Sequence, residues 1–218
     1  DIIVPELKIC KSKYTPLDNK LNKLLPNEYK TLEYERNDKC GLQLIYDVLK
    51  INNVKVNRND IIKNLYEMYK KYMDKYSSKI FTILKKQGKK DEIDKVEKKI
   101  ITFEDYLFSE TYIITELDIL LLSLHYNISI IILDNIQKRG NITNINFIPN
   151  KYDETSTYYL LANYSYLNTP KYKIISNASN NKIQYNALLD FFNSRDDIKI
   201  TICNGTELEL KDFDLIRH

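Results

Sequence analysis

The sequence of 218 residues contains no tryptophan, two histidines, three cysteines and four glycines. So few glycines exclude a glycine-rich phosphate-binding loop. The wide spacing of Cys10, Cys40 and Cys203 fits neither a disulfide framework nor a zinc site, so we expect a reducing, intracellular compartment. No apolar run reaches the ~20 residues needed to span a membrane. The N-terminus also lacks the basic-then-apolar plan of a signal peptide.

Neither sign of charge dominates, because 33 basic and 30 acidic residues leave a net charge of +3. A dedicated nucleic-acid binder usually carries a basic excess on one face, so composition argues against that class. Hydrophobic residues make up 43% of the chain, enough for the core of one large domain or one domain with an appendage. The dominance of Ile, Asn, Lys and Tyr indicates an AT-rich genome. Because the first residue is Asp1 and not Met, we expect a piece of a longer protein.

The strongest pattern is the stretch Thr111–Leu133, which has a helical half and a β half. Thr115 is the predicted N-cap, because its hydroxyl accepts a backbone N–H that the first turn leaves unpaired. Asp118 places negative charge near the positive end of the helix dipole, and Asn127 is a suitable stop because Asn tolerates the left-handed conformation. The β-branched run Ile128–Leu133 is typical of a strand buried on both faces. The leucines at helical spacing are Leu117, Leu120, Leu121 and Leu124.

The chain before this stretch divides into an arm and the start of the main domain. Residues 1–34, which contain three prolines, are expected to be an irregular N-terminal packing arm. Residues 35–218 are expected to form the domain, with a helical insertion at about 57–100. A helix is predicted to begin at Cys40, and its buried stripe comprises Leu42, Ile45, Val48 and Leu49.

The insertion contains the longest helical pattern, Asn57–Lys86. Asn59 or Asp60 is the predicted cap, and a break is expected at Ser77–Ser78. The mixed charge run Lys85–Lys99 has only two apolar residues, so it is expected to be a solvated connection or exposed helical turn, with a basic contact patch as the alternative.

After the central stretch the periodicity changes to that of strands. A further helix is predicted over Lys182–Phe192, followed by a last strand over Ile198–Cys203. The fold class predicted from this order is α+β, with helices packed on a small, mainly antiparallel sheet. A β run is predicted over Asn141–Ile148, and the strands expected to share one sheet are Ile128–Leu133, Thr157–Asn163 and Lys171–Ser176.

Cys40 is a candidate nucleophile because of its position. Unpaired N–H groups and the dipole at a helix N-terminus stabilise a thiolate and lower the pKa of the thiol. A cysteine nucleophile is commonly found at such a position. The alternative is a small buried residue at a helix start.

The order of these elements resembles the OTU family of cysteine proteases, which are papain-like deubiquitinases. The Asp-Gly-Asn-Cys nucleophile motif of that family corresponds to Asn37–Cys40. Its central helix and following strand are similar to Ile114–Asp118 and Ile128–Leu133. Its catalytic His, in a His-Tyr pair before a strand, would fall on Lys171 of Lys171-Tyr172. The resemblance therefore implies a papain-like fold with Cys40 facing position 171.

A closer likeness is to divergent OTU-like domains in large proteins of giant DNA viruses. The segments that carry it are Tyr112–Leu122, Tyr158–Leu161 and Pro170–Ile175, and the AT-rich composition agrees with such a source. The resemblance spans roughly Glu33–Phe192. It implies an intracellular protein of the host cytoplasm or the virion, without a cofactor or metal.

The departures from the motif bear directly on catalysis. Asn37 stands where the motif has Asp, and Asp38 where it has Gly. A cysteine protease needs a base that titrates near neutrality. The unperturbed pKa of histidine is ~6.5, whereas that of a solvated lysine, the residue type at Lys171, is ~10.4. His125, at the end of the central helix, is a weak alternative base, and a structural role is the preferred interpretation for it. His218 is terminal, and neither histidine falls on the motif position.

Three functions remain open. The first is a catalytically degenerate OTU-like domain that serves as a protein-binding or structural module, with ubiquitin or another viral protein as its partner. The second is an active cysteine protease or deubiquitinase with Cys40 as nucleophile. The third is a nucleic-acid contact through the Tyr- and Lys-rich region Tyr66–Lys90, although core packing explains its helically spaced tyrosines more simply.

Overall fold

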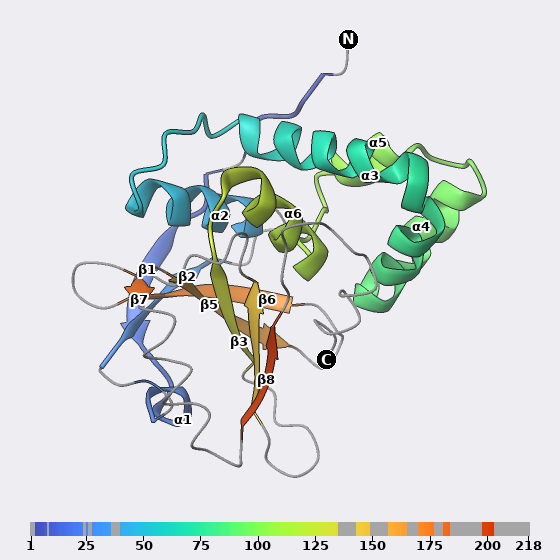
Figure 1. Cartoon of the computed structure of the whole chain (residues 1–218). Coiled ribbons are helices and arrows are strands. Elements are labelled where there is room, and N and C mark those ends of the chain that lie inside the picture. Colours follow the sequence, from blue (N-terminus) through green and yellow to red (C-terminus); the bar gives the residue numbers. More distant parts are fainter. Residues whose placement is uncertain are drawn as a thin grey trace.

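Strands from both ends of the chain pair into one sheet, and helices α2 to α6 gather on one side of it (Figure 1). The computed structural model describes residues 3–7, 9–23, 25, 28–35, 40–134, 143–148, 157–164, 170–176, 181–183 and 198–202. The fold is α+β, as predicted, but the sheet has eight strands and is larger than expected.

The strand order is β1-β2-β6-β5-β3-β4-β8, with β7 paired to β5 beside this path. The pairings β3–β5 and β4–β8 are parallel, and the other five pairings of the described strands are antiparallel. The predicted common sheet of three central strands is therefore confirmed. The bounds are β1 Ser12–Pro16, β2 Lys30–Tyr34, β3 Ile130–Asp134, β4 Thr143–Ile148, β5 Thr157–Tyr164, β6 Pro170–Ser176, β7 Lys182–Ile183 and β8 Ile198–Ile202.

The helices are α1 Asn19–Asn22, α2 Cys40–Ile51, α3 Asp60–Leu84, the π-helical turn η1 Lys85–Lys89, α4 Lys90–Glu97, α5 Phe103–Leu107 and α6 Glu116–Tyr126. Helix α6 packs against α3, and α2 packs against β6. The predicted apolar stripe of α2 is buried in full. Within the described part of the chain, no helix combines the length and the apolar character that a membrane span requires.

The central stretch folds as the sequence predicts. Thr115 caps α6 and forms a reciprocal capping box with Asp118. Asn127 ends the helix in the left-handed conformation, with φ 56° and ψ 49°. Strand β3 follows three residues later, and its side chains from Ile130 to Leu133 are fully buried. Helix α6 and strand β3 together form the centre of the core.

The region predicted to be a helical insertion contains α3, η1 and α4, and its details differ from the prediction. Helix α3 kinks at Tyr76, next to the predicted break, but continues beyond it. Asn59 occupies the N-cap position of α3, as predicted, but its side chain makes no capping bond. Its Oδ1 instead accepts the N–H of Leu7, at 3.1 Å. The charge run is mostly helical, and within it Ile93 is fully buried.

Two further predictions need correction. Residues 1–34 are not irregular throughout, because β1 and β2 form an antiparallel hairpin at the edge of the sheet. Lys182–Ile183 is a short strand, not the start of a helix; the rest of that predicted helix, up to Phe192, lies outside the described residues. In both places pairing with distant strands overrides the local pattern, as is common for β structure.

Candidate functional site

Cys40 is the first residue of α2, as predicted, and its side chain is only 6% exposed. Its sulfur forms a disulfide with Cys10, with the two Cα atoms 5.7 Å apart. The expectation that these cysteines form no disulfide is therefore wrong. In this state Cys40 has no thiol that could act as a nucleophile.

The hairpin explains why two cysteines so far apart in sequence meet. Ser12 of β1 lies opposite Tyr34 of β2, so the antiparallel register carries the preceding and following residues toward each other. The backbone N–H of Glu35 also donates to the carbonyl of Lys11 at 3.1 Å, which extends the ladder by one step. Cys10 and the start of α2 then lie at the same end of the hairpin.

The first turn of α2 lies against the segment that leads into α6. A Cβ atom added to Gly41 would lie 2.1 Å from Cγ2 of Ile114, so glycine is required for this close approach. Asp47, further along α2, accepts hydrogen bonds from the hydroxyl of Tyr34 at 2.6 Å and from the side-chain amide of Gln43 at 2.8 Å. The Tyr34–Asp47 bond thus holds α2 against β2, and the Gly41–Ile114 contact holds it against the segment before α6.

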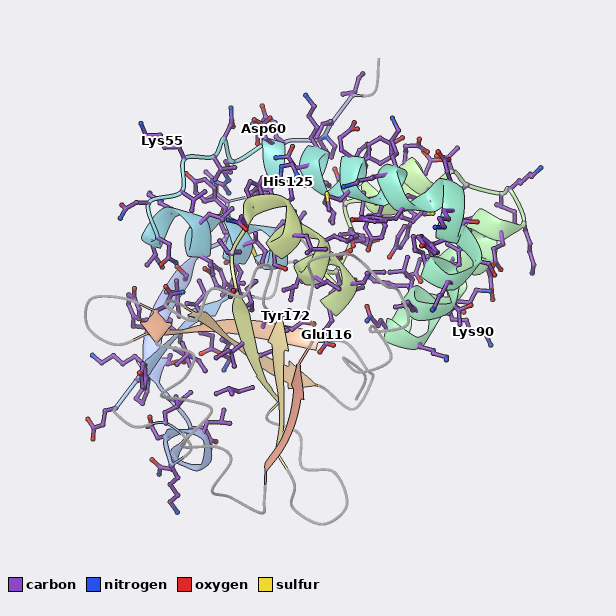
Figure 2. All side chains as sticks on the ribbon, in the orientation of Figure 1. Lys55, Asp60, Lys90, Glu116, His125 and Tyr172 are labelled. Carbon is purple, nitrogen blue, oxygen red and sulfur yellow. A yellow bond between two sulfur atoms is a disulfide. The ribbon has the colours of Figure 1, made fainter. Side chains whose placement is uncertain are left out.

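The weak alternative base, His125, lies at the far end of α6. Figure 2 shows His125 and Glu116 at opposite ends of this helix. Because α6 rises ~1.5 Å per residue, His125 lies roughly 13 Å along the axis from Glu116, at the end of the helix opposite to the contact between Ile114 and Gly41. Its mostly exposed ring packs edge-on against Tyr126, and partial removal of water lowers the pKa of His125. We infer that His125 does not serve as base for Cys40.

The other predicted site residues can be located only in part. Lys171 lies in β6, the strand against which α2 packs, and its Cα is paired with that of Asn163 on β5. The side chain of Lys171 lies outside the described part of the structure, as do Asn37, Asp38, Cys203 and His218 entirely. The next residue of β6, Tyr172, is buried and belongs to the same core cluster as Cys40.

A buried polar cluster at the N-terminus of α6 is the most connected polar feature among the described residues. The Asp118 carboxylate, fully buried, accepts hydrogen bonds from the hydroxyls of Tyr69 and Tyr112 and from the backbone N–H of Thr115, the last at 2.8 Å. The Thr115 hydroxyl accepts the N–H of Asp118 at 3.2 Å. Three elements, α3, α6 and the segment before α6, are thereby joined at one carboxylate.

Burial controls the protonation of this cluster. Desolvation raises the pKa of Asp118, and the hydrogen bonds from Tyr112, Tyr69 and Thr115 oppose that shift only in part. Desolvation, followed by the negative charge of Asp118, raises the pKa of Tyr69 and of Tyr112 well above the ordinary value. Both tyrosines therefore remain hydrogen-bond donors over the whole neutral range. The arrangement is that of a structural clamp.

The turn between α3 and α4 completes the clamp. Gly88 has φ 93°, a conformation that glycine adopts without strain. This sharp turn brings the side-chain carbonyl of Gln87 to the N–H of Leu117, at 3.2 Å. The ammonium of Lys89, 8% exposed, lies 4.9 Å from the centroid of the Tyr112 ring. Nothing in the pattern of this charge run predicts that it reaches the core.

A pocket of about 380 Å³ opens beside this clamp, between α4, α5 and the segment before α6. Its walls carry both signs of charge, from Lys89, Lys95, Glu92 and Asp105, together with the Tyr106 and Tyr112 rings. Lys89 and Tyr112 are already engaged in the clamp, so the pocket offers mainly surface groups. Over the part of the chain that the structure describes, no three His, Cys, Asp or Glu side chains group as a metal site.

No protein-family model, no curated protein and no solved structure matches this chain. The function must therefore be inferred from the residues and their arrangement.

Proposed function

We propose that this chain is a divergent OTU-like domain of a larger viral protein that lacks protease activity and serves as a protein-binding or structural module. The observation that carries the proposal is the packing of α2, which begins at Cys40, against β6, which contains Lys171. These correspond to the helix and the strand that hold the nucleophile and the base in OTU proteases. The partner would be a protein, either ubiquitin or another component of the same virus.

The loss of activity follows from proton transfer. The base of a cysteine protease must accept a proton and return it to the leaving amine at neutral pH. A lysine near its ordinary pKa of ~10.4 stays protonated there, so it can stabilise a thiolate but cannot cycle. His125, at the far end of α6, offers no replacement. Cys40 without a base would be a reactive thiol and not a protease nucleophile.

An active protease remains the second candidate, because Cys40 does begin a helix of 12 residues, where a thiolate is stabilised. The proposed test uses the reduced protein and a ubiquitin-based electrophilic probe, together with ubiquitin chains of defined linkage. We expect slow or no labelling and no chain cleavage. Cleavage that disappears in Cys40→Ala would overturn the proposal in favour of the protease.

A second arm of the experiment restores the missing base. Lys171→His should raise the labelling rate if Lys171 faces Cys40, because an imidazole titrates near neutrality. The matched control is Lys79→His, which introduces the same imidazole at an exposed position of α3. Equal effects of both substitutions would remove the support for Lys171 as the degenerate base position.

A further inference from the structure

The N-terminal segment crosses from the start of α3 to the start of α2. Near its beginning, the buried Leu7 donates its backbone N–H to Asn59 at 3.1 Å. At its other end, the N–H of Lys11 donates to the Glu35 carboxylate at 3.1 Å. Between these points Cys10, 7% exposed, is bonded to Cys40. The segment therefore lies over the candidate nucleophile and blocks it.

Besides the disulfide, the contacts that hold the described part of this segment are the hydrogen bonds at Leu7 and Lys11 and the packing of Val4 and Leu7 on the core. Ile3 is 90% exposed and Ile9 is 76% exposed, so neither contributes much buried apolar surface. Leu7 is the large apolar side chain that the segment buries before Cys10. Ile9 and Lys11, the residues on either side of Cys10, are exposed, whereas Cys10 itself is buried. The covalent bond is the contact that joins this segment directly to the first residue of α2.

We propose that the Cys10–Cys40 disulfide is a reversible redox lock, which holds the N-terminal segment over α2 when oxidised and frees the Cys40 thiol when reduced. The inference rests on the proposed function only in naming Cys40 as the site. The two sulfurs of this bond are unequal, because Cys40 lies at a helix N-terminus, which stabilises it as a thiolate leaving group, whereas Cys10 does not.

The reduction proceeds by two exchanges with a dithiol. One reductant thiolate attacks Sγ of Cys10; the S–S bond breaks, and Cys40 leaves with the electron pair as a thiolate. The second reductant thiolate then attacks the mixed disulfide at the reductant sulfur, so that Cys10 leaves as a thiolate and the reductant closes into a disulfide. Two electrons pass to the cysteines, and the two protons of the dithiol go to the cysteine thiolates or to solvent.

The test uses the full chain with Cys203→Ser, which leaves only the two cysteines of the lock. Peptide mapping after purification without reductant should find Cys10 linked to Cys40. After reduction with dithiothreitol, iodoacetamide should alkylate Cys40 at least ~10-fold faster than Cys10 at pH 7, as expected for a thiol at a helix N-terminus. Unlinked cysteines in the unreduced protein, or equal alkylation rates, would overturn the lock.

Cys10→Ser on the same background is the matched variant, because it frees Cys40 without any reductant. Its Cys40 should be alkylated as fast as in the reduced parent, and the parent measurement decides alone if this variant does not fold by circular dichroism. The readout contains no ubiquitin. Chain cleavage by the reduced protein would therefore overturn the non-catalytic function and leave the lock intact, whereas unlinked cysteines would overturn only the lock.

Discussion

The N-termini of α2 and α6 lie close together and are secured by opposite means. The start of α6 is held by hydrogen bonds, two of them within the motif Thr115–Asp118 and others from Tyr69, Tyr112 and Gln87. The start of α2 is held by a covalent bond to Cys10, 30 residues away in sequence. The first arrangement is permanent at neutral pH, because its donors stay protonated. The second depends on the redox state of its surroundings, so the two helix ends differ in whether they can be released.

Removal of the Asp118 carboxylate should have the largest effect. In Asp118→Ala three buried donors lose their acceptor, two tyrosine hydroxyls and the Thr115 N–H. At about 1–3 kcal/mol for each unsatisfied donor, we expect a loss of about 3–9 kcal/mol in the free energy of unfolding, measured by urea denaturation. The exposed Glu97→Ala, which breaks a surface ion pair with Lys85, is the control and should change the midpoint little.

Loss of the disulfide should come next. Cys10→Ser opens a covalent loop of 30 residues, which by loop entropy alone costs about 3–4 kcal/mol. Urea denaturation of the parent protein with and without dithiothreitol should show the same difference, while Cys10→Ser should be insensitive to the reductant. A parent protein whose stability does not respond to dithiothreitol would contradict the role of the disulfide in securing the start of α2.

The contact between the two helix starts can be tested at Gly41. Gly41→Ala places a methyl group against Ile114, and overpacking of this kind costs about 1–3 kcal/mol. The cost should shrink in an Ile114→Ala background, because Cγ2 is then absent. A double-mutant cycle measures the interaction free energy between the two substitutions. Additive effects would show that the contact between the two helix starts does not contribute to stability.

The tyrosines of the clamp should have the smallest effect on the free energy of unfolding at neutral pH, but a distinctive effect at alkaline pH. The raised pKa values of Tyr69 and Tyr112 mean that the folded state keeps protons which the unfolded chain releases above pH 10. Their contribution to stability is therefore complete below pH 10 and is lost as the pH rises beyond it. Tyr112→Phe should flatten this decline in urea denaturation between pH 9 and 11. Tyr14→Phe, at an exposed site, should leave it unchanged.

The same contrast explains what could be predicted from sequence. Residues that are adjacent in sequence determine the cap of α6, its end at Asn127 and the strand that follows. Local chemistry is therefore sufficient to predict these three features. The Cys10–Cys40 bond and the β1–β2 hairpin depend on pairing across long separations, which no local pattern encodes. The contacts of Gln87 and Lys89 with the clamp cannot be predicted for a related reason, because they depend on the turn at Gly88 that directs this charged run toward the core. The sequence predicts a helix that begins at Cys40, but it does not predict that Cys40 forms a disulfide with Cys10.

The position of β2 in the sheet also has a consequence for synthesis of the chain. Lys30 in β2 pairs with Ser176 in β6, so the strand beside the N-terminal hairpin is made long after the hairpin itself. At translation rates of ~5–20 residues per second, the hairpin waits on the order of 10–30 s for its neighbour. During that interval β2 has an open edge that can pair with other chains. A ribosome-bound chain halted before β6 should therefore be the form most prone to aggregation.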